Sequence, residues 1–160
     1  MKICLVRIDD RLIHGQVATV WAKAVECNRI IACSDEAAAD PLRKALLLQV
    51  TPLGIKSYVL PVNKAIEVYK NPKNNDFKTL FLFTNPTDVL RMVEEGVDIT
   101  SVNVGGMCYK HGKVLITNAV SVDKQDVESF RKLHDRGIEL EVRKVASDNK
   151  INLMSLDLPF

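Results

Sequence analysis

The stretch that decides the fold is TLFLFTNPTDVLRMVEEG, which runs from Thr79 to Gly96. Its first five residues, Thr79–Phe83, predict a strand buried on both faces, because such apolar runs are typical of central parallel strands covered by helices on each side. Asn85 then caps a helix with Pro86 in its first turn, and Gly96 ends that helix. A buried strand followed directly by a capped helix is the building unit of an α/β protein.

The same unit recurs on either side of this stretch. Further strands are predicted at Ile3–Ile8, Arg29–Cys33, Lys56–Leu60, Ser101–Val104, Lys113–Ile116 and Glu139–Val145. A first helix is predicted from about Gln16, with an apolar stripe of Val17, Val20, Trp21 and Ala24, and a second follows the Asp40-Pro41 cap. Two more are predicted, one that carries Val62, Ala65, Ile66 and Tyr69, and one that begins near Asp123, carries Val127, Phe130 and Leu133 and ends at Gly137. The GGM segment, Gly105–Met107, is predicted to turn. We therefore expect one α/β domain over residues 1–160, with a predominantly parallel sheet and helices on both faces.

Composition excludes several classes of protein. The 160 residues are 47% hydrophobic and 26% charged, as in an ordinary globular domain. A formal net charge of +2, with no basic run that carries interleaved aromatics, gives no reason to expect a nucleic-acid partner. Nucleotide-binding motifs of the G-x-x-x-x-G-K-[ST] or G-x-G-x-x-G type are missing after the first strand, so no cofactor is predicted.

The expected location is the cytoplasm. No apolar run approaches the roughly 20 residues that cross a bilayer, and the first residues, MKICLVRIDD, lack the pattern of a cleavable signal. The four cysteines show no C-x-x-C or zinc-like spacing and are predicted to be reduced, structural thiols.

The richest segment chemically is RIDDRLIHGQVATVW, Arg7 to Trp21, between the first strand and the first helix. In open α/β sheets, ligands bind in the crevice beyond the carboxyl ends of the strands, and the first strand–helix loop is commonly one wall of it. His14 enters the predicted helix, whose free N–H groups favour an anion. Position alone leaves two readings equally open, namely that His14 caps the helix or that it belongs to an anion site.

The neighbouring residue types favour the anion site. An imidazole is a competent nucleophile at neutral pH, and Arg11 can hold a phosphoryl group through charge-assisted hydrogen bonds worth ~1.5–3 kcal/mol. One of Asp9 and Asp10 can orient the imidazole through its other ring nitrogen, while the other shapes the loop. Repulsion between anions argues against either aspartate as a direct phosphate contact.

Competing chemistries find little support. A cysteine nucleophile after the first strand is not favoured, because Cys4 lies within that strand. His111 and His134 lack ligand spacing, so no metal is predicted. His134 is predicted to be solvated on a charged helix, and His111 to lie in an exposed loop rather than at the rim of the crevice.

The segment RIDDRLIHGQV followed by Trp21 resembles the active-site segment of the enzyme IIB component of the mannose/fructose/sorbose class of the bacterial sugar phosphotransferase system. The resemblance continues through LFTNP (Leu82–Pro86), NVGGM (Asn103–Met107) and EVRKVASD (Glu141–Asp148), so it covers essentially the whole chain. It implies a predominantly parallel α/β sheet with helices on both faces, in agreement with the prediction from the residues.

The resemblance also implies roles for individual residues. His14 is then the residue phosphorylated, through Nδ1, and Arg11 and Arg143 bind its phosphate. On its own, Arg143 at a strand end reads as a surface charge. Gly15 and Gln16 are implied as further phosphate-binding residues, and Asp9, Asp10 and Thr84 as support. Asn85 is better explained as a cap, and Met107 either lines a rim that faces the IIA component or belongs to the core.

The implied function is that of a phosphocarrier. His14 takes a phosphoryl group from the phosphohistidine of a IIA protein or domain and passes it to a sugar imported through the membrane components IIC and IID. The chain is then cytoplasmic and associates peripherally with the inner face of the membrane through IIC and IID, and a homo-oligomer is left open. The alternative is a non-catalytic anion-binding or regulatory module, although a pure anion site needs no titratable nucleophile between its arginines.

Overall fold

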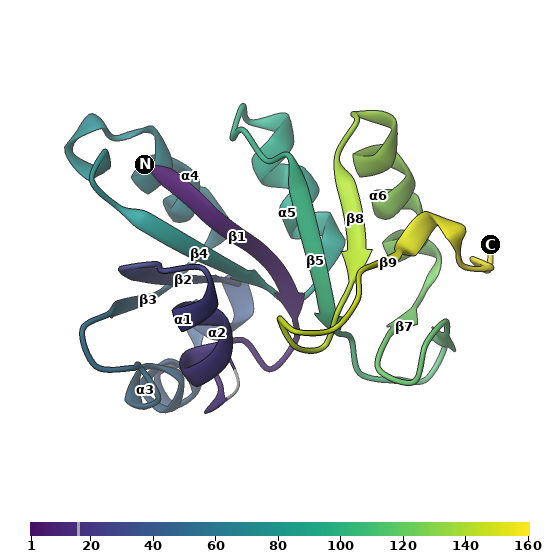
Figure 1. Cartoon of the computed structure of the whole chain (residues 1–160), viewed down its shortest axis with the longest axis horizontal. Coiled ribbons are helices and arrows are strands. Elements are labelled where there is room, and N and C mark those ends of the chain that lie inside the picture. Colours follow the sequence, from purple (N-terminus) through teal and green to yellow (C-terminus); the bar gives the residue numbers. More distant parts are fainter. Residues whose placement is uncertain (16) are drawn as a thin grey trace.

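The computed structural model describes residues 1–15 and 17–160, and its main feature is a seven-stranded sheet in the order β3-β2-β4-β1-β5-β8-β9 (Figure 1). All neighbouring strands run parallel except β9, which is antiparallel to β8 at the edge. The strands are β1 Lys2–Asp9, β2 Arg29–Cys33, β3 Lys56–Leu60, β4 Lys78–Phe83, β5 Ser101–Gly106, β8 Glu139–Val142 and β9 Ile151–Asn152. A separate hairpin joins β6 (Val114–Leu115) and β7 (Ser121–Val122).

Strand β4 is buried on both sides, as its apolar run predicts. Phe81 and Phe83 enter one hydrophobic cluster, whereas Leu80 and Leu82 enter a second. Successive side chains of a strand point to opposite faces, so these two clusters lie on the two faces of the sheet.

Helices cover each face. The cluster of Phe81 and Phe83 contains residues of α4 (Val62–Lys70), α5 (Pro86–Glu94) and α6 (Lys124–Asp135). The cluster of Leu80 and Leu82 contains residues of η1 (Val17–Trp21), α1 (Ala22–Ala24), α2 (Asp35–Ala39) and α3 (Pro41–Gln49). Two short 3₁₀ turns, η2 (Pro72–Asn74) and η3 (Leu153–Ser155), complete the elements. The predicted α/β class is confirmed.

The predicted helix caps are also confirmed. Asn85 Oδ1 accepts the backbone N–H of Asp88 at 2.9 Å, with Pro86 at the first helical position of α5. Asp40 caps α3 in the same way, and Asp123 caps α6. Gly96 and Gly137, which follow α5 and α6, have φ of +93° and +80°, the left-handed conformation that glycine adopts without a steric penalty.

The first helix differs from the prediction. Instead of one α-helix from Gln16, which lies outside the described residues, the chain forms a π-helical turn at η1 and a short α1. The wider turn buries Val17, Trp21 and Ala22 and leaves Val20 39% exposed, so the predicted stripe is wrong at Val20 and at Ala24. The hydroxyl of Thr19 donates to the Gly15 carbonyl at 2.7 Å, a side-chain bond that competes with regular helical bonding.

Two predictions for the C-terminal half of the chain are also wrong. Gly105–Met107 does not turn, because β5 continues through Gly106 and Met107 forms a bridge with Val120. The last predicted strand ends at Val142 rather than Val145, and β9 then forms the edge. The Arg143 N–H still donates to the Val104 carbonyl. The backbone carbonyls of Arg143 and Lys144, however, accept hydrogen bonds from the buried side chain of Arg7 instead of from a neighbouring strand.

Within the described residues, no helix combines the length and the apolar character that crossing a bilayer requires.

Candidate functional site

The loop over residues 10–15 follows β1, which lies between β4 and β5 in the sheet. The chain leaves β1 toward η1 on one face and leaves β4 toward α5 on the other, an arrangement that opens a crevice at the carboxyl ends of the strands. A groove of ≈ 630 Å³ lies there, lined among others by Arg11, Thr84 and Met107. The predicted place of the loop, at the carboxyl edge of the sheet, is therefore confirmed.

Asp9 is the central residue of this loop. Its side chain is fully buried, and its Oδ2 accepts Arg7 Nη2 at 3.1 Å and Arg11 Nη2 at 3.3 Å. Its Oδ1 accepts Arg11 Nε at 3.3 Å and the Arg11 backbone N–H at 3.2 Å. His14 Nε2 lies 3.7 Å from the same Oδ2. Of the two aspartates that the sequence left open, Asp9 is thus the one that faces the imidazole.

The His14 imidazole is held through one ring nitrogen, Nδ1. Nδ1 lies 3.0 Å from the Leu12 carbonyl oxygen, and because a carbonyl can only accept, Nδ1 carries the proton in this conformation. The side chain is 17% exposed, and no group of the described residues lies within hydrogen-bonding distance of Nε2. Leu12 itself adopts φ of +59°, an uncommon conformation for a buried leucine that turns its carbonyl toward the imidazole.

Arg11 is the accessible cation beside His14. Its side chain is 52% exposed, although Asp9, its partner, is fully buried. It also lines the groove at the carboxyl edge. An exposed guanidinium with long contacts of 3.3 Å can turn toward an anion in the groove without leaving a packed position.

Asp10 takes a different role from Asp9. Its Oδ2 accepts the Cys108 backbone N–H at 2.6 Å, and the Cys108 thiol donates to Oδ1 at 3.4 Å. These bonds tie the segment after β5 to the loop after β1, as expected of the aspartate that shapes the loop. The adjacent carboxylate also raises the pKa of the Cys108 thiol. Cys108 is exposed, unlike the buried Cys27 and Cys33, but like them it is a free thiol.

Three more predicted residues fall within the described part of the chain, and two of them, Thr84 and Met107, line the groove. Gly15 is exposed, and a Cβ built on it would meet nothing within 4 Å, so the approach to His14 is open on that side. Thr84 lines the groove, and its hydroxyl accepts Asn85 Nδ2 at 3.0 Å. Met107 is 2% exposed and belongs to the core as well as to the groove wall. Gln16 lies outside the described residues.

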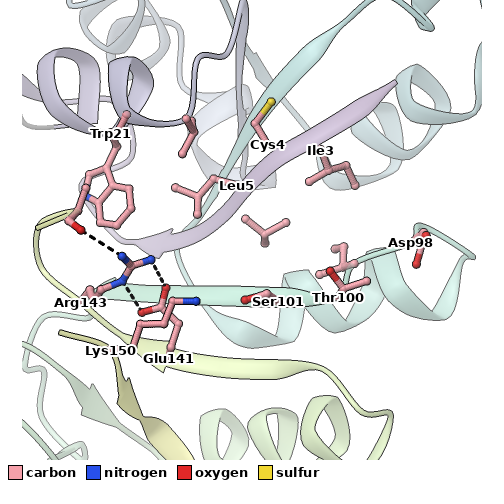
Figure 2. A pocket seen from close by; sticks show the side chains of 15 residues that line it. Ile3, Cys4, Leu5, Trp21, Asp98, Thr100, Ser101, Glu141, Arg143 and Lys150 are labelled. Atoms are coloured by element: carbon pink, nitrogen blue, oxygen red, sulfur yellow. Dashed lines mark hydrogen bonds and ion pairs between the residues drawn. The ribbon is translucent and has the colours of Figure 1, made fainter. Parts of the chain in front are cut away.

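Arg143 is not brought to His14 by any contact that the structure records. Its Nε and Nη2 donate to Glu141 at 2.9 and 2.8 Å, and its Nη1 donates to the Ala146 carbonyl at 3.1 Å (Figure 2). The bonds to Glu141 raise the pKa of the Arg143 guanidinium. Its Cζ lies 5.2 Å from the ring centroid of Trp21, beside a cavity of ≈ 450 Å³ that also contacts Cys4. Arg143 as a phosphate ligand stays a prediction, and the bonds to Glu141 must open before it can bind an anion.

Sequence reasoning missed Arg7, which is completely buried in β1. Its guanidinium donates to Asn103, to Asp9 and to the carbonyls of Arg143 and Lys144. Burial lowers the pKa of this guanidinium, and the charge of Asp9 opposes that shift. The available signal was the pair Gly105-Gly106 two positions beyond Asn103, since adjacent glycines in a strand often mark a place where another group approaches closely.

The other two histidines, His111 and His134, are exposed, as predicted. Across residues 1–15 and 17–160, no three His, Cys, Asp or Glu side chains gather in a way that could hold a metal ion.

The sequence was compared with known proteins. Residues 3–158 match the model of the family described as the sorbose subfamily IIB component of the PTS system. The chain is 60% identical, over 98% of its length, to the mannose-specific EIIAB component of Escherichia coli (strain K12), of which it spans only 48%. It is 49% identical to the sorbose-specific EIIB component of Klebsiella pneumoniae, with 96% of this chain and 94% of that protein covered.

Solved structures agree with the sequence comparisons. The crystal structure of the IIBSor domain of the sorbose permease from Klebsiella pneumoniae superposes with a TM-score of 0.94 at 49% identity, and the match covers 97% of this chain and 95% of that one. A structure titled manxB from Thermoanaerobacter tengcongensis superposes with a TM-score of 0.88 at 30% identity, over 96% and 93% of the two chains. The chain spans about half the length of the EIIAB relatives it matches but nearly all of the EIIB ones. On its sequence, its sheet topology and this structural match, the chain belongs to the sorbose-subfamily IIB components of the phosphotransferase system.

Proposed function

We propose that this chain is the phosphocarrier of a sugar phosphotransferase system. In this proposal His14 accepts a phosphoryl group from the phosphohistidine of a IIA protein or domain and donates it to a sugar during import through IIC and IID. The chain then works in the cytoplasm, next to the membrane that holds IIC and IID. Family membership supports the reaction class, and the geometry around His14 supports the residue.

The observation that carries the assignment is that His14 and Arg11 share one buried carboxylate, Asp9, at the carboxyl end of the central strand β1. An imidazole is nucleophilic only at a nitrogen without a proton. Asp9 lies 3.7 Å from Nε2, and a carboxylate there favours the tautomer whose proton sits on Nε2. That tautomer frees the lone pair of Nδ1, the nitrogen proposed to carry the phosphoryl group.

Phosphorylation at Nδ1 requires one rearrangement. Nδ1 now donates to the Leu12 carbonyl, and this bond must open as the proton moves to Nε2. The P–N bond at the donor histidine then breaks as the bond to Nδ1 forms, and both imidazoles keep one proton. Because phosphoryl transfer is mostly positioning and charge stabilisation, the remaining task is to hold the equatorial oxygens.

Arg11 is proposed to hold those oxygens first, because it is exposed and borders the groove. Arg143 is proposed to join after it releases Glu141. Gly15 contributes open space in which its backbone can approach the phosphoryl group, and Thr84 contributes a hydroxyl at the groove wall. Gln16 is proposed as a further ligand from the family resemblance alone.

The test is phosphoryl acceptance from a phosphorylated IIA domain, followed by intact mass. The parent is expected to gain one phosphoryl mass that is labile in acid and stable in base, as a phosphoramidate is. His14→Ala should gain none while it keeps its fold, because a loop side chain contributes little packing. The matched controls are His111→Ala and His134→Ala, which change exposed histidines and should label like the parent. A labelled His14→Ala, or an acid-stable label, would reject the assignment.

A further inference from the structure

Arg7 is a charged side chain in the interior that the proposed reaction does not yet use. It lies in β1 with no exposed surface, two residues before Asp9. Burying a guanidinium is costly unless its donors find acceptors. The two terminal nitrogens of Arg7 meet that condition: Nη2 donates to Asp9 at 3.1 Å and to the Lys144 carbonyl at 3.1 Å, while Nη1 donates to the Arg143 carbonyl at 3.0 Å and to Asn103 Oδ1. Nε is buried without an acceptor among the described residues.

The bond to Asp9 gains importance once Arg11 is assigned to the phosphoryl group. Arg7 and Arg11 donate to the same Oδ2 that faces His14. If Arg11 turns to a phosphoryl group in the groove, Arg7 is the arginine that remains paired with Asp9 among the described residues. Without Arg7, a fully buried carboxylate would lose its charge compensation at that moment, and its position beside His14 would no longer be fixed.

Arg7 also connects the two arginines of the proposed site. Its bonds to the carbonyls of Arg143 and Lys144 connect the segment that follows β8 to β1, across the intervening strand β5. The indole of Trp21 reinforces this junction, because Nε1 donates to the same Lys144 carbonyl at 3.2 Å and the ring centroid lies 4.8 Å from Arg7 Cζ. Figure 2 shows Trp21 beside Arg143 on this side of the sheet. One buried side chain thus contacts the carboxylate behind His14 and the backbone of Arg143.

The space for this guanidinium depends on Gly105 in β5. A Cβ built on Gly105 would lie 2.0 Å from Arg7 Cζ, so any other residue would displace the guanidinium. The neighbouring glycine is different, since a Cβ on Gly106 would meet nothing nearer than Asp9 Oδ1 at 3.7 Å, an ordinary contact. The space that the Arg7 guanidinium occupies, and not a turn at GGM, therefore explains why position 105 is a glycine.

We propose that Arg7 is a positioning residue for phosphoryl transfer: it fixes Asp9 beside His14 when Arg11 turns to the phosphoryl group, and Gly105 reserves the space it needs. This inference rests on the proposed function of His14. It assigns no contact between Arg7 and the phosphoryl group, because the side chain is buried behind Asp9.

The experiment compares Gly105→Ala with Gly106→Ala in the transfer assay with a phosphorylated IIA domain. Gly105→Ala should slow phosphoryl acceptance by ~10–100-fold, since a misplacement of about 1 Å at a reacting centre can cost 10²-fold. The donor concentration that gives half the maximal rate should stay within about twofold, because the exposed surface is unchanged. Gly106→Ala should match the parent in both quantities. Long-range ¹H–¹⁵N spectra of the His14 imidazole should change in Gly105→Ala only.

A second variant tests the same inference in case Gly105→Ala does not fold. Arg7→Lys keeps the buried charge but loses the planar fork that reaches four acceptors, so it should show the same loss of rate with the imidazole signals shifted. Either variant that folds and transfers at the parental rate, or an equal loss in Gly106→Ala, would overturn the inference. A His14→Ala protein that still accepts the phosphoryl group in the same assay would instead refute the proposed function.

Discussion

Arg11 and Arg143 each pair with a carboxylate two positions earlier in the chain, yet they are held very differently. Arg11 contacts Asp9 at 3.3 Å with a side chain that is 52% exposed, whereas Arg143 contacts Glu141 at 2.8 and 2.9 Å and is 17% exposed. Asp9 also serves Arg7, so it can release Arg11 and stay paired, while Glu141 has Asn103 Nδ2 as its other recorded donor. Two arginines with the same local pattern therefore differ in how readily each can bind an anion.

The largest effect is expected from Arg11→Lys. Lysine keeps the charge but loses bidentate bonding to a phosphoryl group, so the transfer rate should fall by about tenfold to hundredfold, which corresponds to ~1.5–3 kcal/mol. The melting temperature should barely change, because the side chain is half exposed. Stopped reactions with a phosphorylated IIA domain measure the rate. Arg136→Lys, which changes an exposed arginine after α6, is the matched control, and equal rates in all three proteins would remove Arg11 from the site.

Arg143→Lys should have a smaller effect on the rate and a larger one on stability. If Arg143 joins the phosphoryl group only after leaving Glu141, the rate should fall by about threefold. The lost fork to Glu141, which is 3% exposed, should cost about 1 kcal/mol of unfolding free energy and lower the melting temperature by ~2–4 °C. Thermal unfolding and transfer kinetics on one preparation measure both. A rate loss as large as that of Arg11→Lys would show that the two arginines contribute equally.

The double variant Arg11→Lys/Arg143→Lys tests whether the two side chains act on one group. Residues that share a partner are not additive, so the double should lose about twofold less rate than the product of the single losses. Strict additivity, measured in the same kinetic series, would mean that the arginines act on separate steps.

The smallest effect is expected from Glu141→Gln. The amide keeps the shape of the carboxylate but removes the charge that holds Arg143, so about 1 kcal/mol of stability should be lost. The transfer rate should stay within about twofold of the parent, because Arg11 still holds the phosphoryl group. A fall as deep as that of Arg143→Lys would indicate that Glu141 has a role of its own in transfer.

Local features of the sequence predicted most of the fold. The run Thr79–Phe83 predicted a strand buried on both faces, and Asn85 and Asp40 predicted caps, because these signals depend on neighbouring residues alone. Two of the predictions that were wrong, the turn at Gly105–Met107 and the end of the last strand, depended on contacts distant in sequence. The pair Gly105-Gly106 is typical of a turn, but here Gly105 leaves space for the Arg7 side chain. Strand β8 ends early because the carbonyls of Arg143 and Lys144 accept hydrogen bonds from Arg7.

The site divides in the same way. The order of His14, Arg11 and Asp9 along one loop is a sequence property, and with the family resemblance it was sufficient to propose a phosphohistidine site. Which aspartate faces the imidazole could not be read from RIDDR, since Asp9 and Asp10 differ only in the direction their side chains take. The sheet decided it: Asp9 ends β1 in a buried position beside Gly106, and Asp10 reaches Cys108.

By itself the sequence determined the class of fold, the position of the loop after the first strand and the candidate residues for a phosphoryl site, because periodicity, capping and side-chain chemistry are encoded locally. Only the tertiary structure decided that Arg7 is buried behind Asp9, that Nδ1 of His14 rests on the Leu12 carbonyl and that Arg143 is bound to Glu141. Each of these depends on which strands become neighbours and which polar groups are thereby removed from water. A buried guanidinium or carboxylate must find its partners among whatever backbone and side chains the sheet places beside it.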